Sequence, residues 1–161
     1  MSTVELDTII LEVYRQARVM SNGVNIKLGH EDQAIVYGDP DRLKQLLINL
    51  VTNAIKHTPP GGDVTISLYR DPEMVRVIVA DTGRGIAPGA LPHIFERFYQ
   101  ADAGNHKGSG LGLSIAQWIA NAHNGQITVT SQLDKGSTFT LWLPLQTESD
   151  RTKPSKVVST S

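Results

Sequence analysis

The sequence predicts an α/β (α+β) fold: a two-layer sandwich of a mixed, largely antiparallel sheet with three main helices on one face. Its 161 residues are enough for one domain with a proper core. Segments with helical and strand periodicity follow one another in the order α-β-β-α-β-β-loop-α-β-β. Several strand pairs are separated only by short turns, which favours antiparallel or mixed pairing. Three amphipathic helices can cover only one face of such a sheet, and this predicts two layers.

Two helices and four strands are expected in the first half of the chain. Apolar residues at helical spacing predict a helix over residues 6–20, which Asn22-Gly23 ends. Asp39 is a good N-cap and Pro40 suits the first helical position, so a second helix is expected to start here and run to about His57. Alternating apolar residues predict strands over residues 24–28, 35–37, 64–68 and 75–79.

A glycine-dense stretch with little regular structure separates Asp81 from Gly112, apart from a short apolar piece at residues 91–98. A third helix is expected over residues 110–124, with Gly125 as its stop. The residues expected to face inward from this helix are Leu111, Ile115, Trp118, Ile119 and Ala122.

The end of the chain predicts a closing hairpin and then a tail. Residues 127–129 and 139–143 alternate as two strands do. After them the sequence becomes polar and rich in Ser, Thr and Lys. We therefore expect one domain over residues 1–145 and a disordered tail over residues 146–161.

Composition excludes several classes of function. A formal net charge of −1 provides no electrostatic case for binding nucleic acid or an acidic membrane surface. The absence of cysteine excludes a disulfide framework and a thiolate metal site, and it fits a reducing compartment. No apolar run approaches the roughly 20 residues that cross a bilayer, and the N-terminus does not resemble a signal peptide. We expect a cytoplasmic, monomeric domain without direct membrane insertion.

The helix that ends at His57 carries the first chemical signal. Asn49, Asn53, Lys56 and His57 form a polar stripe at i, i+4, i+7 and i+8, beside the apolar stripe of the same helix. Asparagine costs roughly half a kcal/mol relative to alanine inside a helix, so two in register point to ligands. A carboxamide oxygen suits Mg²⁺, and the two basic side chains can meet phosphate oxygens. The alternative is a solvated polar edge of an amphipathic helix.

A second signal follows directly on the strand over residues 75–79. Asp81 at the end of a buried strand is partly desolvated and can accept a hydrogen bond from an exocyclic amine such as that of adenine. Gly83 and Gly85 would let a flat ring approach the backbone. The alternative is a tight D-x-G turn, which is common.

A third signal is the glycine-rich stretch from Gly108 to Leu113, which leads straight into a helix. Free N–H groups at a helix N-terminus bind anions, and glycines let a phosphate come close. The stretch is neither a P-loop nor a dinucleotide fingerprint, because it lacks the G-K-[ST] ending and follows no strand. The alternative, a flexible linker, is weakened by the apolar Leu111 and Leu113.

The segment from Ile94 to Gln100 is aromatic, and a polar loop over residues 101–107 follows it. Aromatic residues beside a glycine-rich loop predict the hinge and latch of a lid. The alternative is that Phe95 and Phe98 belong to the core, and the two interpretations are compatible.

Taken together, five segments in this order strongly resemble the catalytic domain of sensor histidine kinases, over about Leu6 to Pro144. The resemblance implies the two-layer ATP-binding sandwich that this family shares with gyrase, mismatch-repair and heat-shock chaperone ATPases, with a loop that closes over ATP as a lid. The segments are the N box (49–58), the first glycine box (81–86), the F box (95–99), the second glycine box (108–113) and a final G-x-T element (136–138).

By this resemblance, Asn53 coordinates Mg²⁺ and Asn49 helps to place the metal and the phosphates. Lys56 and His57 reach toward the phosphates, although many relatives have tyrosine where this chain has His57. Asp81 binds the adenine amino group, and Thr138 supports the base through water. Asn49, Asn53 and Lys56 form the implied catalytic set. Further ATP contacts are implied for Gly83, Gly85, Ile86, Phe98, Lys107, Gly108, Ser109, Gly110, Leu111, Gly112 and Leu113, and a weaker phosphate contact for Arg97.

The reaction follows from one position of the N box. The ATPase relatives carry a glutamate base where this chain has Asn49, which cannot act as a base at neutral pH. A histidine acceptor needs no such base, because a neutral imidazole nitrogen has a free lone pair. The sequence therefore favours phosphoryl transfer to a histidine. The alternative is a regulatory module that binds ATP without transferring its phosphate.

The acceptor histidine is expected on a separate dimerisation and histidine-acceptor domain upstream of this chain. If the parent protein is bound to a membrane, its anchor lies outside this sequence. A response regulator is then an indirect partner. His30-Glu31 superficially resembles the family's acceptor motif, but the next residues do not continue it and the context is a loop. We expect His93, His106 and His123 to be surface or lid residues.

Overall fold

Five strands form one sheet in the computed structural model, which describes residues 1–97, 99 and 112–146. The strand order is β2-β4-β5-β7-β6, and only the β2–β4 pair is parallel. The main-sheet strands are β2 (Asn25–Glu31), β4 (Asp63–Arg70), β5 (Met74–Asp81), β6 (Gln126–Gln132) and β7 (Gly136–Pro144). The predicted hairpins of β4 with β5 and of β6 with β7 are confirmed.

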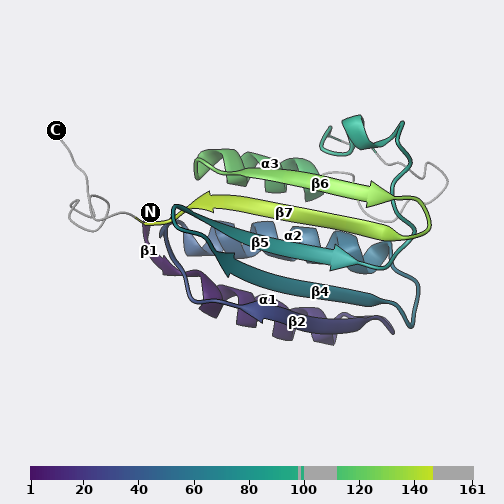
Figure 1. The fold of residues 1–161 in the computed structure, drawn as a ribbon, viewed down its shortest axis with the longest axis horizontal. Coiled ribbons are helices and arrows are strands. Elements are labelled where there is room, and N and C mark those ends of the chain that lie inside the picture. Colours follow the sequence, from purple (N-terminus) through teal and green to yellow (C-terminus); the bar gives the residue numbers. More distant parts are fainter. Residues whose placement is uncertain (98, 100–111, 147–161) are drawn as a thin grey trace.

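Within the described residues, three α-helices cover a single face of this sheet (Figure 1). They are α1 (Leu6–Val19), α2 (Pro40–Lys56) and α3 (Gly112–Ala122), and a short 3-10 turn, η1, covers Leu91–His93. The apolar stripe of α2 lies at the centre of the core, because Leu43, Leu46 and Leu50 are completely buried. The predicted two-layer α/β sandwich is confirmed.

A small second sheet was not predicted. It pairs β1 (Ser2–Glu5) antiparallel with β3 (Ile35–Gly38), so that the buried Val4 and Val36 lie opposite each other. The four residues of β1 are too few to show a strand period on their own. Gln146, which the sequence assigned to the tail, extends this region by donating its N–H to the Ile35 carbonyl. Residues 147–161 lie outside the described part.

The ends of the helices follow their capping residues. Asp39 caps α2 as predicted, since its carboxylate accepts hydrogen bonds from the N–H groups of Asp41 at 3.0 Å and Arg42 at 3.2 Å. Asn22 and Gly23 both have positive φ after α1, as a helix stop requires. After α3 it is Asn124, with φ 60°, that takes the left-handed conformation rather than Gly125.

Two residues of α3 do not face inward as predicted. Trp118 is 59% exposed, and the Arg42 guanidinium lies 5.2 Å from its ring centroid. Ala122 is exposed as well. The buried face of α3 consists instead of Ala116, Ile119 and Ala120. The small alanines let α3 approach α2 closely, and Trp118 then points to solvent because it lies on the other side of the helix.

Candidate nucleotide-binding site

The polar stripe of α2 runs to the end of the sandwich where β5 also ends. Asn49, Asn53 and Lys56 are half-buried along it. The Asn49 amide donates a hydrogen bond to the Gly112 carbonyl at 3.1 Å, which leaves its oxygen for a ligand. The Asn53 carboxamide makes no hydrogen bond with any described residue, although it is half-buried. Among the described residues nothing occupies the Asn53 amide oxygen, which is the kind of ligand that a metal or phosphate site requires.

His57 closes α2, and an arginine that the sequence did not single out is bonded to it. Arg84 donates from its guanidinium to Nδ1 of His57 at 2.8 Å, and its backbone N–H donates to the His57 carbonyl at 3.1 Å. Because a guanidinium can only donate, His57 accepts through Nδ1 in this arrangement. His57, Arg84 and Lys56 line a depression of about 380 Å³ with Thr58, Pro59 and Pro60. Arg84 stands between Gly83 and Gly85, at a position that the D-x-G-x-G motif leaves unspecified.

Asp81 is the most deeply buried carboxylate among the described residues, at 8% exposure. Its Oδ1 accepts hydrogen bonds from the N–H groups of Gly83 at 2.8 Å and Ser137 at 3.2 Å. Burial raises the pKa of Asp81, and these two N–H groups lower it by a smaller amount. No described residue donates to Oδ2, so this oxygen remains available to a ligand with an N–H group.

Gly83 and Gly85 are required for close backbone packing, and not for the approach of a flat ring as the sequence suggested. A Cβ on Gly83 would lie 2.2 Å from the His57 carbonyl oxygen, and one on Gly85, at φ +73°, would lie 2.1 Å from the Gln132 carbonyl oxygen. The space is thus filled by backbone and is not left open for a flat ring. Gly83 lets the loop after β5 press against the end of α2, while Gly85 lets it press against the β6–β7 turn.

Thr138 does not lie beside Asp81. In the β5–β7 ladder Asp81 pairs with Ser137, whereas Thr138 pairs with Ala80. Side chains of paired residues share a face and successive residues alternate, so Thr138 faces the open side of the sheet while Ser137 faces the side of Asp81. The register thus places the Thr138 side chain on the opposite face of the sheet from Asp81. Ser137, which is buried, stands in the appropriate place.

Ser137 belongs to a small polar group next to Asp81. Its hydroxyl lies 2.8 Å from the hydroxyl of Ser131, which also accepts a hydrogen bond from the Ile86 N–H at 2.7 Å. This bond holds the predicted site residue Ile86 beside the β6–β7 hairpin. No pattern in the sequence singles out Ser131, because a serine in a strand usually just faces water.

The start of α3 lies opposite the asparagines of α2. Gly112 is exposed, and a Cβ at this position would have no described heavy atom within 4 Å. It therefore leaves room for a ligand, in contrast to Gly83 and Gly85, and the half-buried Leu113 follows it. The other predicted positions of the lid and second glycine box lie outside the described residues: Phe98, Lys107, Gly108, Ser109, Gly110 and Leu111.

The F box contributes to the core. Phe95 packs edge-on against Phe139, with ring centroids 6.3 Å apart, and Ile94 is buried. The core interpretation of Phe95 is confirmed, and that of Phe98 lies outside the described part. The described residues contain no cluster of three or more His, Cys, Asp or Glu that could bind a metal ion.

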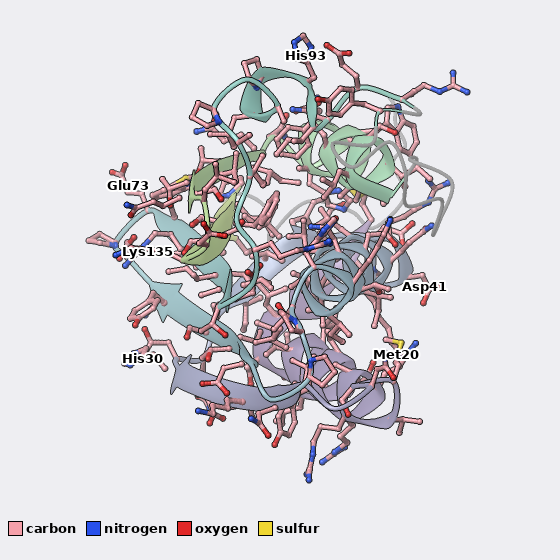
Figure 2. The ribbon with its side chains drawn as sticks, turned by 90° about the vertical axis from the view of Figure 1, so that its right-hand side faces the viewer. Met20, His30, Asp41, Glu73, His93 and Lys135 are labelled. Atoms are coloured by element: carbon pink, nitrogen blue, oxygen red, sulfur yellow. The ribbon has the colours of Figure 1, made fainter. Side chains whose placement is uncertain are left out.

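The histidines were assigned correctly in one respect and wrongly in another. His30 lies on β2 rather than in a loop, where it stacks on Tyr69 with ring centroids 4.5 Å apart, on the sheet side of the molecule (Figure 2). The acceptor motif of the family lies on a helix, and His30 does not. His93 is exposed, but His123 is buried at 6% exposure, contrary to the expectation of a surface residue.

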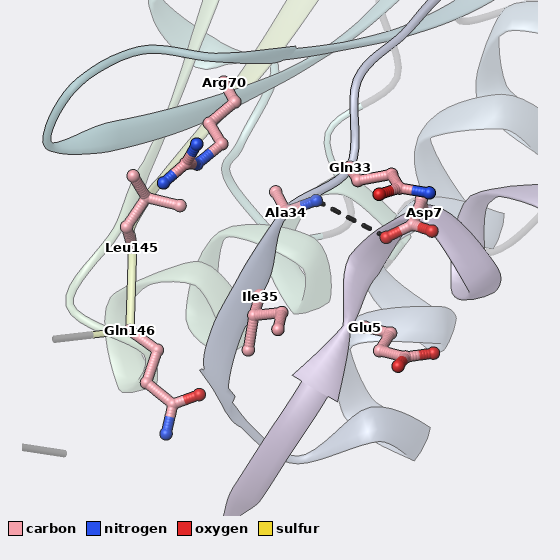
Figure 3. Close-up of a pocket in the computed structure, with 8 residues that line it drawn as sticks. All are labelled: Glu5, Asp7, Gln33, Ala34, Ile35, Arg70, Leu145 and Gln146. Atoms are coloured by element: carbon pink, nitrogen blue, oxygen red, sulfur yellow. Dashed lines mark hydrogen bonds between the residues drawn. The ribbon is translucent and has the colours of Figure 1, made fainter. Parts of the chain in front are cut away.

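A second depression of about 370 Å³ lies at the opposite end of the sheet, near β1 and the end of β7 (Figure 3). Glu5, Asp7 and Arg70 supply its charged groups, and Asp7 accepts a hydrogen bond from the Ala34 N–H at 3.4 Å. None of the predicted site residues lines it. The candidate site is therefore the end where α2, β5 and the start of α3 meet. No helix in the described part of the chain has the length and apolar character to span a bilayer.

A buried aspartate that ends a central strand, opposite a helix with two asparagines, defines a nucleotide-binding domain of the two-layer sandwich class. Residues 38–147 match the family model described as histidine kinase-, DNA gyrase B-, and HSP90-like ATPase, and the chain belongs to this family. The resemblance inferred from the five motifs is thereby confirmed.

Sensor histidine kinases are among its relatives and structural neighbours. The adaptive-response sensory kinase SasA of Synechococcus elongatus is 45% identical over 116 residues, which cover 71% of this chain and 30% of SasA. The mycobacterial sensor histidine kinase MprB superposes with a TM-score of 0.82 at 28% identity, over 89% of this chain and 98% of that one. Full-length ShkA in complex with AMPPNP superposes with a TM-score of 0.78 at 32% identity, over 89% and 31%. The chain thus spans less than a third of SasA.

Proposed function

We propose that this chain is the ATP-binding catalytic domain of a two-component sensor histidine kinase. It binds Mg·ATP and transfers the γ-phosphoryl group to a histidine on a separate dimerisation and histidine-acceptor domain. The acceptor domain then transfers the phosphoryl group to a response regulator. The family match and the similarity to ShkA, whose structure contains AMPPNP, support ATP as the ligand. A cytoplasmic location and a monomeric isolated domain are part of this proposal.

The observation that carries the proposal is the asymmetry of Asp81. Its Oδ1 is occupied by two backbone N–H groups, whereas no described residue donates to Oδ2. Oδ2 is not among the fully buried atoms that lack a partner, so it reaches the surface, where a ligand with an N–H group can bind it. The 6-amino group of adenine is such a donor, and guanine presents an oxygen at the same position. Asp81 therefore selects ATP, while Ser137 replaces Thr138 as the residue beside the base.

The phosphate end is formed by α2 and α3. Asn53 is proposed to coordinate Mg²⁺ through its free carboxamide oxygen, with Asn49 and phosphate oxygens beside it. Lys56, His57 and the N-terminus of α3 then face the negative charge of the triphosphate. Magnesium would supply charge neutralisation at the γ-phosphate. The chain's own residues bind and orient the nucleotide.

The chain supplies no base for activating water at the position where ATPase relatives carry one. Asn49 is an amide, and its N–H is already donated to the Gly112 carbonyl. An imidazole acceptor attacks the γ-phosphorus with its own lone pair, the bond to the bridging oxygen breaks, and ADP leaves. This arrangement favours transfer to a histidine over hydrolysis, so the isolated domain is expected to turn over little ATP.

The decisive experiment mixes this domain with its acceptor domain and ATP labelled at the γ-phosphate. We expect label on the acceptor histidine that resists base and is lost in acid, as a phosphoramidate is. Tight nucleotide binding without any label would favour the alternative, a regulatory module that holds ATP without transferring it.

The base pocket has its own test in Asp81→Asn. The backbone N–H groups of Gly83 and Ser137 require the amide oxygen, so the new NH₂ group must face the ligand. We expect ATP affinity to fall roughly 10- to 100-fold, the worth of a hydrogen bond to a charged group. Inosine triphosphate, which has an oxygen in place of the amine, should gain affinity relative to ATP. Unchanged preference for ATP would show that the base lies elsewhere.

A further inference from the structure

His123 is a buried histidine that joins two helices of the candidate site, and neither the motifs nor the proposed mechanism uses it. It follows the last turn of α3 and is 6% exposed. Its Nδ1 lies 2.8 Å from the Ile119 carbonyl oxygen, and its Nε2 accepts a hydrogen bond from the Asp39 N–H at 3.0 Å. Because the Asp39 N–H must donate, the proton of the neutral ring is on Nδ1 and points to Ile119.

The start of α2 depends on this bond for a reason that lies in its own sequence. The N–H of an N-cap residue is often accepted by a glutamate or glutamine three residues on, in a capping box. Here that third residue is Arg42, which has no acceptor. The Asp39 carboxylate is engaged with the N–H groups of Asp41 and Arg42. His123 therefore completes the cap of α2 from a different helix.

The end of α3 depends on the same side chain. The backbone N–H of His123 bonds to the Ala120 carbonyl instead of continuing the helical pattern to Ile119. The Ile119 carbonyl is thus one of the unpaired groups that every helix C-terminus leaves, and the His123 ring satisfies it. One imidazole consequently bridges the C-terminus of α3 and the N-terminus of α2.

The backbone leaves little freedom around this joint. A Cβ on Gly38, the residue before Asp39, would lie 2.6 Å from Cδ2 and 2.9 Å from Nε2 of His123. Since Gly38 has no side chain, β3 can approach the ring closely, and the ring is held between β3, α2 and α3. Gly38 itself is buried.

The opposite ends of the two helices form the phosphate half of the site. There the second polar bond between them joins the Asn49 amide to the Gly112 carbonyl. Between the two joints the helices pack through residues that are completely buried, such as Leu46 and Ala116. A close-packed helix moves as a rigid rod. A shift at Asp39 is therefore passed to Asn53, about 21 Å further along the axis of α2.

We propose that His123 is a positioning residue for the triphosphate end of the nucleotide: it sets the placement of Asn53 on α2 relative to the N-terminus of α3. This inference rests on the proposed function, because it assumes that metal and phosphates lie between these two helices. The base pocket, which β5 and β7 build, does not depend on His123.

Two substitutions separate positioning from mere packing, because each keeps one of the two bonds. His123→Gln places an amide near the position of Nε2 and can still accept from the Asp39 N–H. His123→Asn places an amide near Nδ1, so it can still donate to Ile119 but leaves Asp39 without an acceptor. Both are tested in the full 161-residue chain, with thermal unfolding measured alongside.

The measurement is calorimetric affinity for Mg·ATP and, in parallel, for adenosine as a ligand without phosphates. We expect His123→Asn to weaken Mg·ATP binding roughly 10-fold and His123→Gln by no more than about threefold, with adenosine affinity equal in both. Gly38→Ala, whose Cβ displaces the ring, should behave as His123→Asn does. Gly89→Ala is the matched control, because a Cβ there meets no described atom within 4 Å.

Three results would overturn the inference: equal losses in the glutamine and asparagine variants, a parallel loss of adenosine affinity, or unchanged Mg·ATP affinity in His123→Asn and Gly38→Ala. If His123→Asn does not fold, Gly38→Ala takes its place in each comparison: an equal loss in His123→Gln, a parallel loss of adenosine affinity or an unchanged Mg·ATP affinity would each overturn the inference. Failure of the nucleotide-binding part of the proposed function would look different, because the unaltered chain would then not bind Mg·ATP at all; failure of the transfer step alone would leave all these affinities as they are and would show only as missing label on the acceptor histidine.

Discussion

Asp81 on the strand side of the candidate site and Asn53 on the helix side are held in different ways. Asp81 ends β5, is clamped through Oδ1 by two backbone N–H groups, and is surrounded by glycines whose Cβ positions are occupied by backbone. Asn53 makes no side-chain hydrogen bond with a described residue, and across from it Gly112 has open space.

This difference matches the two parts of a nucleotide. A flat base is recognised by one acceptor in a fixed place, which a sheet register supplies without adjustment. Phosphates and a metal need several ligands, and the facing ends of α2 and α3 supply them from two separate helices. The site thus combines a strand side that is placed by sheet register with a helix side that is placed by the packing of α2 against α3.

The largest expected effect comes from a substitution that affects only the helix side of the site. Asn53→Ala removes the free carboxamide oxygen, and a metal ion contributes several kcal/mol to such a reaction. We expect labelling of the acceptor histidine to fall about 1000-fold. Adenosine affinity should stay as in the unaltered chain, because Asp81 is untouched. A comparable loss of adenosine affinity would contradict the division into two sides.

A matched pair of glycine substitutions contrasts the two sides directly. Gly85→Ala introduces a Cβ at φ +73° against the Gln132 carbonyl, so we expect a loss of about 3 kcal/mol in the free energy of unfolding. Gly112→Ala meets no described atom and should change the free energy of unfolding by less than about 0.5 kcal/mol. Denaturant titration measures both.

The affinity for Mg·ATP, measured on the folded variants, should fall more in Gly112→Ala than in Gly85→Ala. If phosphates approach Gly112, the alanine variant should bind Mg·ATP less tightly although its stability is unchanged. Unchanged affinity in Gly112→Ala would mean that the phosphates do not come close to this backbone.

A smaller effect on ATP affinity tests which hydroxyl of β7 belongs to the strand side of the site. Ser137→Ala removes the hydroxyl on the face of Asp81, and we expect ATP affinity to fall about fivefold, as for one neutral hydrogen bond. Thr138→Val removes the hydroxyl on the opposite face and should leave affinity unchanged. The reverse result would restore the role that the motif suggested for Thr138.

The smallest effect is a pH dependence of stability. Burial raises the pKa of Asp81 above the value of 3.8 that it has in the unfolded chain. A raised pKa means that the folded state holds this proton more tightly, so its contribution to stability is present below 3.8 and is lost as pH rises through the folded pKa. Asp81→Asn lacks this loss. Its Tm relative to the unaltered chain should therefore increase from pH 4 to pH 7, and a constant difference would contradict burial as the cause.

Much of this molecule follows from local patterns in the sequence. The Asp39 cap, the leucine stripe of α2 and the two hairpins depend on neighbours within a few residues, and all are present. The five motifs indicated the family correctly because each combines a residue type with a fixed spacing. Local patterns could not tell why Gly83 and Gly85 are glycines, since the atoms they avoid lie far away in the chain.

Other features depend on pairings between distant segments. A motif that reads G-x-T does not say which of Ser137 and Thr138 faces Asp81, because that is decided by the register of β7 on β5. Trp118 was expected in the core from its spacing along the helix, but the buried face of α3 contains alanines and Ile119 instead. Nothing local in the sequence indicates the bond between His123 and Asp39, because the two residues lie 84 positions apart.

By itself the sequence determined the class of fold, the family and the residue types at the site, because periodicity, capping and motif spacing are local properties of the chain. Only the tertiary structure decided which oxygen of Asp81 is free, which hydroxyl stands beside it and how α2 is joined to α3. These are relations between atoms on different elements, and they come into existence when the elements pack.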